Sequence, residues 1–298
     1  MTRAGAASKS LSRWLTLVVL LCACAPEQQF AALGDLPLEN GEVLRDCRIG
    51  YRTFGQLDAA RSNAVLVTPW AMGTSRDLAR QIASGRLLDA AGRYVIAVDA
   101  FANGVASSPS NSVPQRGDAF PRFSMRDVVE SQYQLLTRVL GISRLEAVIG
   151  SSAGGMQVFQ WITAHPEFVG AAVAIAGSPR SSETDRRHRN ATADQARRMP
   201  PRERNFDLER QAAAIAALDV SAPFGGSMER AAAAVRSKLL VIVPERDEVV
   251  DPAPAMEFAR LARADLVVLD GRCGHRAPSC ERESIRDAIA RFLGSRSR

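Results

Sequence analysis

The sequence predicts an α/β protein built on a doubly wound, mostly parallel sheet. Short apolar, β-branched runs alternate with segments of helical period along most of the 298 residues. Most of these runs are continuously apolar, as expected for parallel strands that helices cover on both faces. The composition, 46% hydrophobic and 23% charged, is that of a globular chain long enough to bury a large core.

The individual elements follow from these patterns. Residues 42–51 mix apolar and polar residues, which predicts an antiparallel pair of edge strands. Buried strands are expected at 63–68, 94–99, 145–149, 170–176, 239–243 and 265–269. Helices are expected at 77–88, 127–140, 152–164, 254–264 and 282–292.

The segment at about 180–236 interrupts this alternation. It has no clear strand, it is rich in Arg, Ala and Glu, and residues 208–218 form an Ala-rich helical piece. We expect a short helical cap over the strand ends. Its Arg residues would suit an anionic substrate, but the interspersed acids favour a solvated helix face.

The first residues are typical of a targeting signal. A positively charged start precedes a short apolar run at 14–21, which is too short to span a bilayer permanently. The following Leu-Cys-Ala-Cys sequence is similar to a bacterial lipobox with Cys24 as the acylated residue, although Cys22 is unusual at its position. Ordinary cleavage nearby and a misassigned start codon are the alternatives.

These features divide the chain into a lipoprotein-type signal peptide (1–23), a linker (24–37) and one domain (38–298) that carries the cap. The expected location is outside the cytoplasm, either periplasmic or anchored to the membrane through a lipid on Cys24. The formal net charge of +6 would fall to +3 without residues 1–23, which is too mild to indicate a nucleic-acid partner. The oligomeric state is left open.

The sequence Gly150-Ser-Ser-Ala-Gly154 lies where a strand pattern ends and a helical pattern begins. It fits G-x-S-x-G, the nucleophile elbow, in which a strained turn exposes the central Ser152 and any side chain at the glycines would clash with backbone. The alternatives are a plain glycine-rich turn or a phosphate cradle. No Gly-Lys-Ser/Thr follows, which disfavours the cradle.

A base for Ser152 must be one of three histidines. His165 lies at the far end of the same helix, about 20 Å away at ~1.5 Å per residue, and His188 lies in the polar cap. His275 follows the last expected strand, at the sheet edge where the elbow lies. We therefore expect His275 to be the base.

An acid that orients His275 is expected in the loop after strand 239–243. Asp247 is the first choice, and Asp251 and Glu245 are the alternatives. The chain order of serine, acid and histidine is the one that hydrolases with this elbow use. The acid would accept the Nδ1 proton and stabilise the imidazolium.

An oxyanion hole requires two backbone N–H groups. The N–H of Ala153, at the start of the helix, is one candidate. The other is Ala71 in the loop after strand 63–68, where Ala71 and Gly73 let the backbone approach the substrate. Trp70 is expected to line the acyl pocket, and the loop at 99–109 to shape the same edge.

Several of these segments resemble the homoserine O-acetyltransferase-like branch of the α/β-hydrolase superfamily across most of residues 38–295. The resemblance is carried by Tyr51-Arg-Thr-Phe-Gly55, Asn63-Ala-Val-Leu-Val67, Ser107-Ser-Pro-Ser-Asn111, Arg126-Asp127-Val128 and, above all, Gly154-Gly-Met-Gln157 with Trp161. It implies the triad Ser152, Asp247 and His275. It also implies a ping-pong mechanism in which Ser152 takes an acyl group and passes it to an acceptor.

Three departures from that family bear on the acceptor. Acetyltransferases of this kind have an Asp after the catalytic His, where this chain has Arg276, and their helical lid is longer. Ala102 replaces a loop glycine. An exported protein also has no obvious supply of acetyl-CoA, so water is the favoured acceptor.

The cysteines suit an oxidising compartment. Cys273 and Cys280 flank His275 and are expected to form a disulfide that holds its loop. A zinc site of these two residues with His275 would consume the base and lacks an apparent fourth ligand, so neither a metal nor a cofactor is expected. Cys47 remains as a free, buried thiol.

The favoured function is hydrolysis of a small ester through an acyl-enzyme. One alternative is an O-acyltransferase that moves an acyl group to an alcohol, and a second is a non-catalytic binding lipoprotein. The acyl donor and acceptor depend on the cap and the pocket, for which the sequence has no diagnostic motif.

Overall fold

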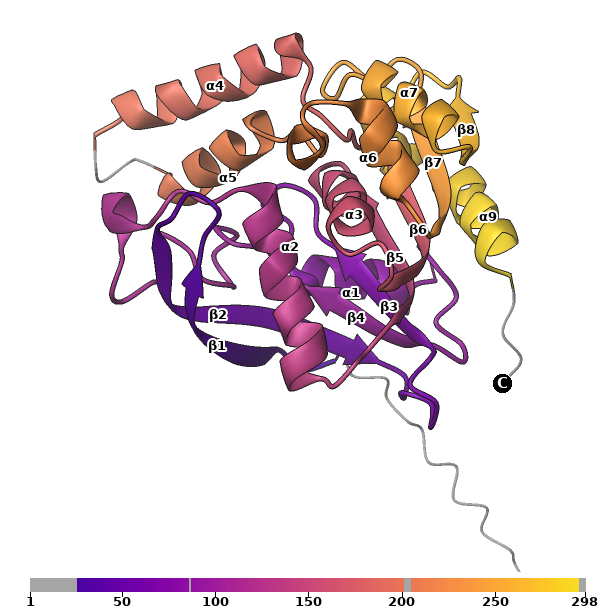
Figure 1. Ribbon diagram of the computed structural model, residues 1–298, viewed down its shortest axis with the longest axis horizontal. Coiled ribbons are helices and arrows are strands. Elements are labelled where there is room, and N and C mark those ends of the chain that lie inside the picture. Colours follow the sequence, from indigo (N-terminus) through magenta and orange to yellow (C-terminus); the bar gives the residue numbers. More distant parts are fainter. Residues whose placement is uncertain (1–25, 86, 201–204, 295–298) are drawn as a thin grey trace, which may run out of the picture.

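The computed structural model describes residues 26–85, 87–200 and 205–294. An eight-stranded sheet in the order β1-β2-β4-β3-β5-β6-β7-β8 forms its centre (Figure 1). β2 is antiparallel to β1 and to β4, and the other neighbours are parallel. The doubly wound, mostly parallel sheet that the sequence predicts is therefore confirmed. The strands are β1 (Gln29–Pro37), β2 (Val43–Phe54), β3 (Ala64–Thr68), β4 (Tyr94–Val98), β5 (Leu145–Ser151), β6 (Val169–Ile175), β7 (Lys238–Pro244) and β8 (Asp265–Leu269).

Helices cover both faces of this sheet. Side chains of α1 (Ser75–Ala83) and α9 (Arg282–Leu293) pack on one face. The other face carries α2 (Met125–Gln134), α3 (Ala153–Ala164) and α7 (Ala253–Leu261). Successive strand residues face opposite cores, which explains why the parallel strands are continuously apolar.

The segment expected to be a cap contains three helices: α4 (Glu183–Arg198), α5 (Phe206–Ala216) and α6 (Met228–Ala234). α4 and α5 lie against each other above the sheet (Figure 1), and α5 reaches the loops that follow β3 and β4. In contrast, α6 packs with α3 and α7 in the main core. The covering part of the segment is thus narrower than the predicted 180–236.

The amino-terminal edge of the sheet differs from the sequence prediction. Residues 29–37, assigned to a linker, form strand β1, and residues 42–51 lie within the single strand β2 rather than forming a pair. Most β1 side chains are exposed; only Ala31 and Leu36 are buried. An edge strand with so few buried positions has little hydrophobic periodicity to reveal it.

Three helices end earlier than expected, among them the one predicted at 254–264, which ends at Leu261. The helix predicted at 77–88 ends at Ala83, and Gly85 follows with a φ of +63°. The helix predicted at 127–140 is α-helical to Gln134 and then continues as a turn of π-helix at Leu135–Val139. None of these changes moves the strand ends that carry the site.

The described residues contain no helix that is both long enough and apolar enough to cross a membrane. The predicted signal peptide at 1–23 and the predicted acylation site at Cys24 lie outside the described residues.

Candidate active site

Ser152 occupies the tight turn between β5 and α3. Its backbone has φ 55° and ψ −123°, a conformation that non-glycine residues rarely adopt. A Cβ atom at Gly150 would lie 2.3 Å from the carbonyl oxygen of Gly154, and one at Gly154 would lie 2.5 Å from that of Thr68. Both glycines are needed because the turn leaves no space for a side chain, as the sequence pattern predicts.

The hydroxyl of Ser152 faces an imidazole. Its Oγ lies 2.8 Å from Nε2 of His275, and Nδ1 of His275 lies 2.7 Å from Oδ2 of Asp247. The side chain of Asp247 is 1% exposed and that of His275 is 21% exposed. A buried acceptor on Nδ1 favours the tautomer in which Nε2 is free to take the serine proton.

Asp247 is held in place by its own loop. The N–H groups of Val249 and Val250 donate to its Oδ1 at 2.8 and 2.9 Å, which leaves Oδ2 for the histidine. Asp251 instead accepts the N–H of Ala253. Glu245, the other alternative, is exposed. The structure thus brings Asp247 to the histidine.

The remaining two histidines lie elsewhere. His165 ends α3, where its ring stacks on Tyr133 with the centroids 4.0 Å apart. Its Nε2 lies 3.5 Å from the carboxylate of Glu130, and that hydrogen bond lowers the pKa of Glu130. His188 is exposed on α4.

The two proposed oxyanion donors line the same pocket. Ala153 is the first residue of α3, so its N–H has no acceptor within the helix. Ala71 follows β3, and both alanines line one pocket. Gly73 was expected to let the backbone approach the substrate. In the structure a Cβ atom there would lie 2.9 Å from the ring of Trp70, so packing against Trp70 requires a glycine.

The pocket beside these alanines is narrow and mostly apolar. The space in it that the centre of a water molecule could reach is about 20 Å³. Such a space holds roughly one water molecule or a group of similar size. Its lining comes from the β3 and β4 loops, α2, α3 and α5, namely Pro69, Trp70, Ala71, Ala100, Phe101, Phe123, Met125, Val128, Ala153, Gln157, Gln211, Ala214 and Ile215.

Buried amide side chains brace the loop that carries Ala71. Gln157 donates to the carbonyl oxygen of Pro69 at 3.0 Å, and Gln211 of α5 accepts the N–H of Met72 at 2.7 Å. Asn103 donates to the carbonyl oxygen of Gly73 at 3.0 Å. The motif that ends in Gln157 was visible in the sequence. Nothing in the sequence distinguished Gln211 from other polar cap residues.

The 99–109 loop shapes this edge, as expected. Asp99 is fully buried and accepts the N–H of Ser75 at 2.7 Å and the amide of Asn103 at 2.9 Å. Ala102, which replaces a family glycine, has a φ of +58°. The loop therefore keeps a glycine-like backbone at this position with an alanine.

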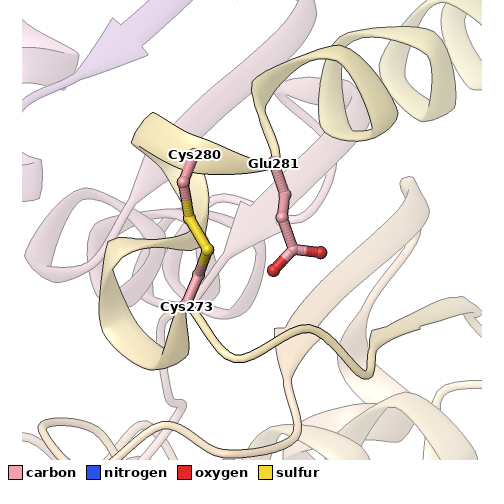
Figure 2. A group of neighbouring side chains, drawn as sticks. All are labelled: Cys273, Cys280 and Glu281. Atoms are coloured by element: carbon pink, nitrogen blue, oxygen red, sulfur yellow. A yellow bond between two sulfur atoms is a disulfide. The ribbon is translucent and has the colours of Figure 1, made fainter.

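Cys273 and Cys280 are joined by a disulfide beside the histidine loop (Figure 2). With Glu281 they are the one group of potential metal ligands among the described residues. His275 is outside that group, and both of its ring nitrogens already have partners. Bonded sulfurs are not thiolate ligands, so the zinc alternative finds no support in this arrangement. Cys47 is a free, buried thiol, and burial raises its pKa to about 12.

The Arg residues of α4 are mostly solvated. Arg187 pairs with Glu183, and Arg197 pairs with Asp194 along the exposed helix surface. Arg189 is half-buried, and this burial lowers its pKa despite the opposing field of nearby carboxylates. These two ion pairs therefore agree with the solvated helix face that the sequence favoured over a site for an anionic substrate.

Comparison with known proteins identifies the family of this fold. A family profile described as "alpha/beta hydrolase fold" matches residues 71–222. An ethyl acetate hydrolase of Pseudomonas veronii is 39% identical over 155 residues, which is 51% of this chain and 44% of that protein. A homoserine O-acetyltransferase of Citrifermentans bemidjiense is 37% identical over 166 residues, or 50% and 45% of the two chains.

These alignments span about half the length of the curated relatives. The fold similarity extends further. The crystal structure of an acetylester hydrolase from Corynebacterium glutamicum superimposes with a TM-score of 0.80, covering 90% of this chain and 96% of that one at 23% identity. With the family profile matching half of the chain, and with a serine elbow at the end of β5, this protein belongs to the α/β-hydrolase fold family.

Proposed function

We propose that this protein is a serine esterase that hydrolyses esters of short carboxylic acids. The observation that carries the proposal is the continuous contact from Ser152 through His275 to buried Asp247. A hydroxyl, an imidazole and a carboxylate in this order are the groups that acyl transfer through a serine requires. Names of the relatives, which include an ethyl acetate hydrolase, support the same chemistry.

In the first half of the proposed reaction, Nε2 of His275 takes the proton of Ser152 as the oxygen attacks the ester carbonyl. The N–H groups of Ala71 and Ala153 stabilise the resulting oxyanion. When the intermediate collapses, the imidazolium protonates the departing alkoxide, and the alcohol leaves. In the second half, His275 deprotonates a water molecule, which attacks the acyl-enzyme and releases the acid.

The size of the pocket supports a short acyl group. Its lining is mostly apolar, and its free space suits a methyl-sized group rather than a long chain. Since Phe101 and Val128, which line it, are buried, the walls around it are part of the packed core. We therefore expect acetyl esters to be turned over faster than butyryl or longer esters.

A panel of p-nitrophenyl esters with two to eight acyl carbons tests this function. The wild-type protein is expected to hydrolyse the acetyl ester best, and Ser152→Ala is expected to reduce kcat by at least 10³-fold. If both proteins hydrolyse the panel at equal rates, the esterase proposal is wrong.

An O-acyltransferase is the second candidate, because homoserine O-acetyltransferases are among the relatives. The exposed Arg276 at the position where those enzymes have an Asp speaks against a homoserine acceptor. The same acetyl ester with added homoserine distinguishes the two functions. An esterase releases acetate at an unchanged rate, whereas a transferase forms O-acetylhomoserine. A non-catalytic binding protein would show neither product.

We further propose export through residues 1–23 and lipidation at Cys24, which the lipobox-like sequence supports. Mass spectrometry of the protein from membrane fractions of a bacterial host tests this. The expected result is a chain that starts at Cys24 with the added mass of lipid, and Cys24→Ala should lack that mass. An unprocessed amino terminus would contradict the proposal.

A further inference from the structure

The loop after β3 is clamped by two buried glutamines from different parts of the fold. Gln157 lies on α3, directly behind the elbow, and Gln211 lies on α5 of the cap. The two residues are 2% and 7% exposed. Gln157 bonds the carbonyl oxygen of Pro69, two residues before Ala71, and Gln211 bonds the N–H of Met72, the residue after it. We propose that Gln157 and Gln211 are positioning residues that hold the Ala71 N–H in the oxyanion hole.

The first clamp fixes the start of the loop. The Gln157 amide donates to the carbonyl oxygen of Pro69, and its Oε1 accepts from Gln132 at 2.7 Å. Gln132 in turn accepts the indole N–H of Trp161 at 2.9 Å. This chain of bonds fixes the amide orientation of Gln157, because its oxygen is committed to Gln132 and its NH₂ must face the loop.

The second clamp fixes the peptide after Ala71. Oε1 of Gln211 accepts the N–H of Met72, whose φ is +60°, and its Nε2 donates to the carbonyl oxygen of Phe101 at 2.8 Å. Among the described residues, the Ala71 N–H makes no hydrogen bond. The neighbouring polar groups of the loop are thus bonded while this N–H is left for a substrate oxygen.

The position of Gln211 couples the cap to the chemistry. An oxyanion donor acts only when it is held at the place where charge develops, so a shift of the Met72 peptide would weaken the hole. Because α5 supplies the acceptor for that peptide, stabilisation of the transition state depends on the position of α5. This inference rests on the proposed esterase function, and it assigns the cap a role beyond covering the pocket.

Two substitutions of similar shape test the clamps. Gln157→Met and Gln211→Met remove the bonds to the loop, and Gln160→Met is the matched control. Gln160 is 5% exposed on the same helix as Gln157 and makes no side-chain hydrogen bond to another described residue. Thermal unfolding and circular dichroism establish that each variant is folded at the assay temperature.

The expected result is a loss of kcat for p-nitrophenyl acetate of about 10- to 100-fold in both clamp variants, with KM changed less than about threefold. Gln160→Met should keep kcat within about twofold of wild type. The kcat loss should be equal for acetyl and propionyl esters. A loss that depends on acyl length would instead assign the glutamines to substrate contact, and this would overturn the positioning role.

A transition-state mimic provides a readout that general destabilisation does not change. A trifluoromethyl ketone forms a tetrahedral adduct on serine with an oxyanion, so its Ki should rise in each clamp variant by the factor lost in kcat/KM. Unchanged Ki and kcat in both folded variants would overturn the inference while leaving the esterase function intact. If wild-type protein neither hydrolyses the ester nor binds the ketone, the proposed function itself fails.

Discussion

Replacing Asp247 by Asn changes one oxygen of the side chain to NH₂. It tests whether Asp247 sets the tautomer in which Nε2 of His275 can accept the serine proton. In the native loop, Oδ1 accepts the N–H groups of Val249 and Val250, and Oδ2 accepts Nδ1–H of His275. An asparagine oxygen can keep the first two bonds. Its NH₂ group must then face Nδ1, which forces the imidazole into the tautomer with a proton on Nε2.

That tautomer cannot accept the proton of Ser152. The expected loss in kcat is about 10⁴-fold, equivalent to about 5.5 kcal/mol of transition-state stabilisation. The free energy of unfolding should fall by only about 1–3 kcal/mol, since one charge-assisted bond is lost and the loop bonds remain. The fold should therefore survive the change that removes the activity.

The assay compares Asp247→Asn with Asp251→Asn on p-nitrophenyl acetate, with thermal unfolding of both. Asp251 lies in the same loop and makes no hydrogen bond to His275, so its variant should keep at least half of the wild-type kcat. The reasoning is refuted if folded Asp247→Asn retains more than a tenth of wild-type activity, or if the two variants are equally impaired.

Three further predictions concern stability. Gly150→Ala places a Cβ 2.3 Å from a carbonyl oxygen and should lower the free energy of unfolding by at least about 3 kcal/mol or prevent folding. Gly34→Ala is opposed only by its φ of +72° and should lower it by about 1 kcal/mol. Denaturant titration compares the two variants. Reducing the disulfide of Cys273 and Cys280 should lower the unfolding free energy by about 2–3 kcal/mol, and unchanged denaturant midpoints would contradict this. Burial raises the pKa of Cys47 from 9.0 to about 12, so the unfolded thiol ionises first. The contribution of the neutral thiol to the free energy of unfolding is complete below pH 9 and falls by about 1.4 kcal/mol per pH unit as pH rises towards 12. Cys47→Ala should lack this decrease in thermal melts at pH 8–11.

The predictable part of the site came from strong local constraints. The turn at Ser152 admits only glycine at 150 and 154, and the G-x-S-x-G pattern in the sequence indicates this requirement. Three histidines left few choices for a base. The order of Asp247 and His275 on loops after successive parallel strands then placed both at the edge where β5 ends.

The unpredicted part depends on contacts between distant residues. Gln211 meets Met72 across 139 positions of sequence, and no local pattern separates it from solvated cap residues. Asp247 was the first choice from the sequence, but Asp251 and Glu245 lie in the same loop, and the loop conformation was needed to see which carboxylate meets His275. Strand β1 escaped prediction since its side chains are largely exposed.

Covalent labelling of Ser152 tests the central claim most directly. The wild-type protein is incubated with a fluorophosphonate and digested, and the modified peptide is sequenced by mass spectrometry, with Ser152→Ala and His275→Ala as controls. The account predicts one adduct per chain, on Ser152, that neither control forms. An adduct on another residue, or no adduct on folded wild-type protein that binds the reagent, would contradict it.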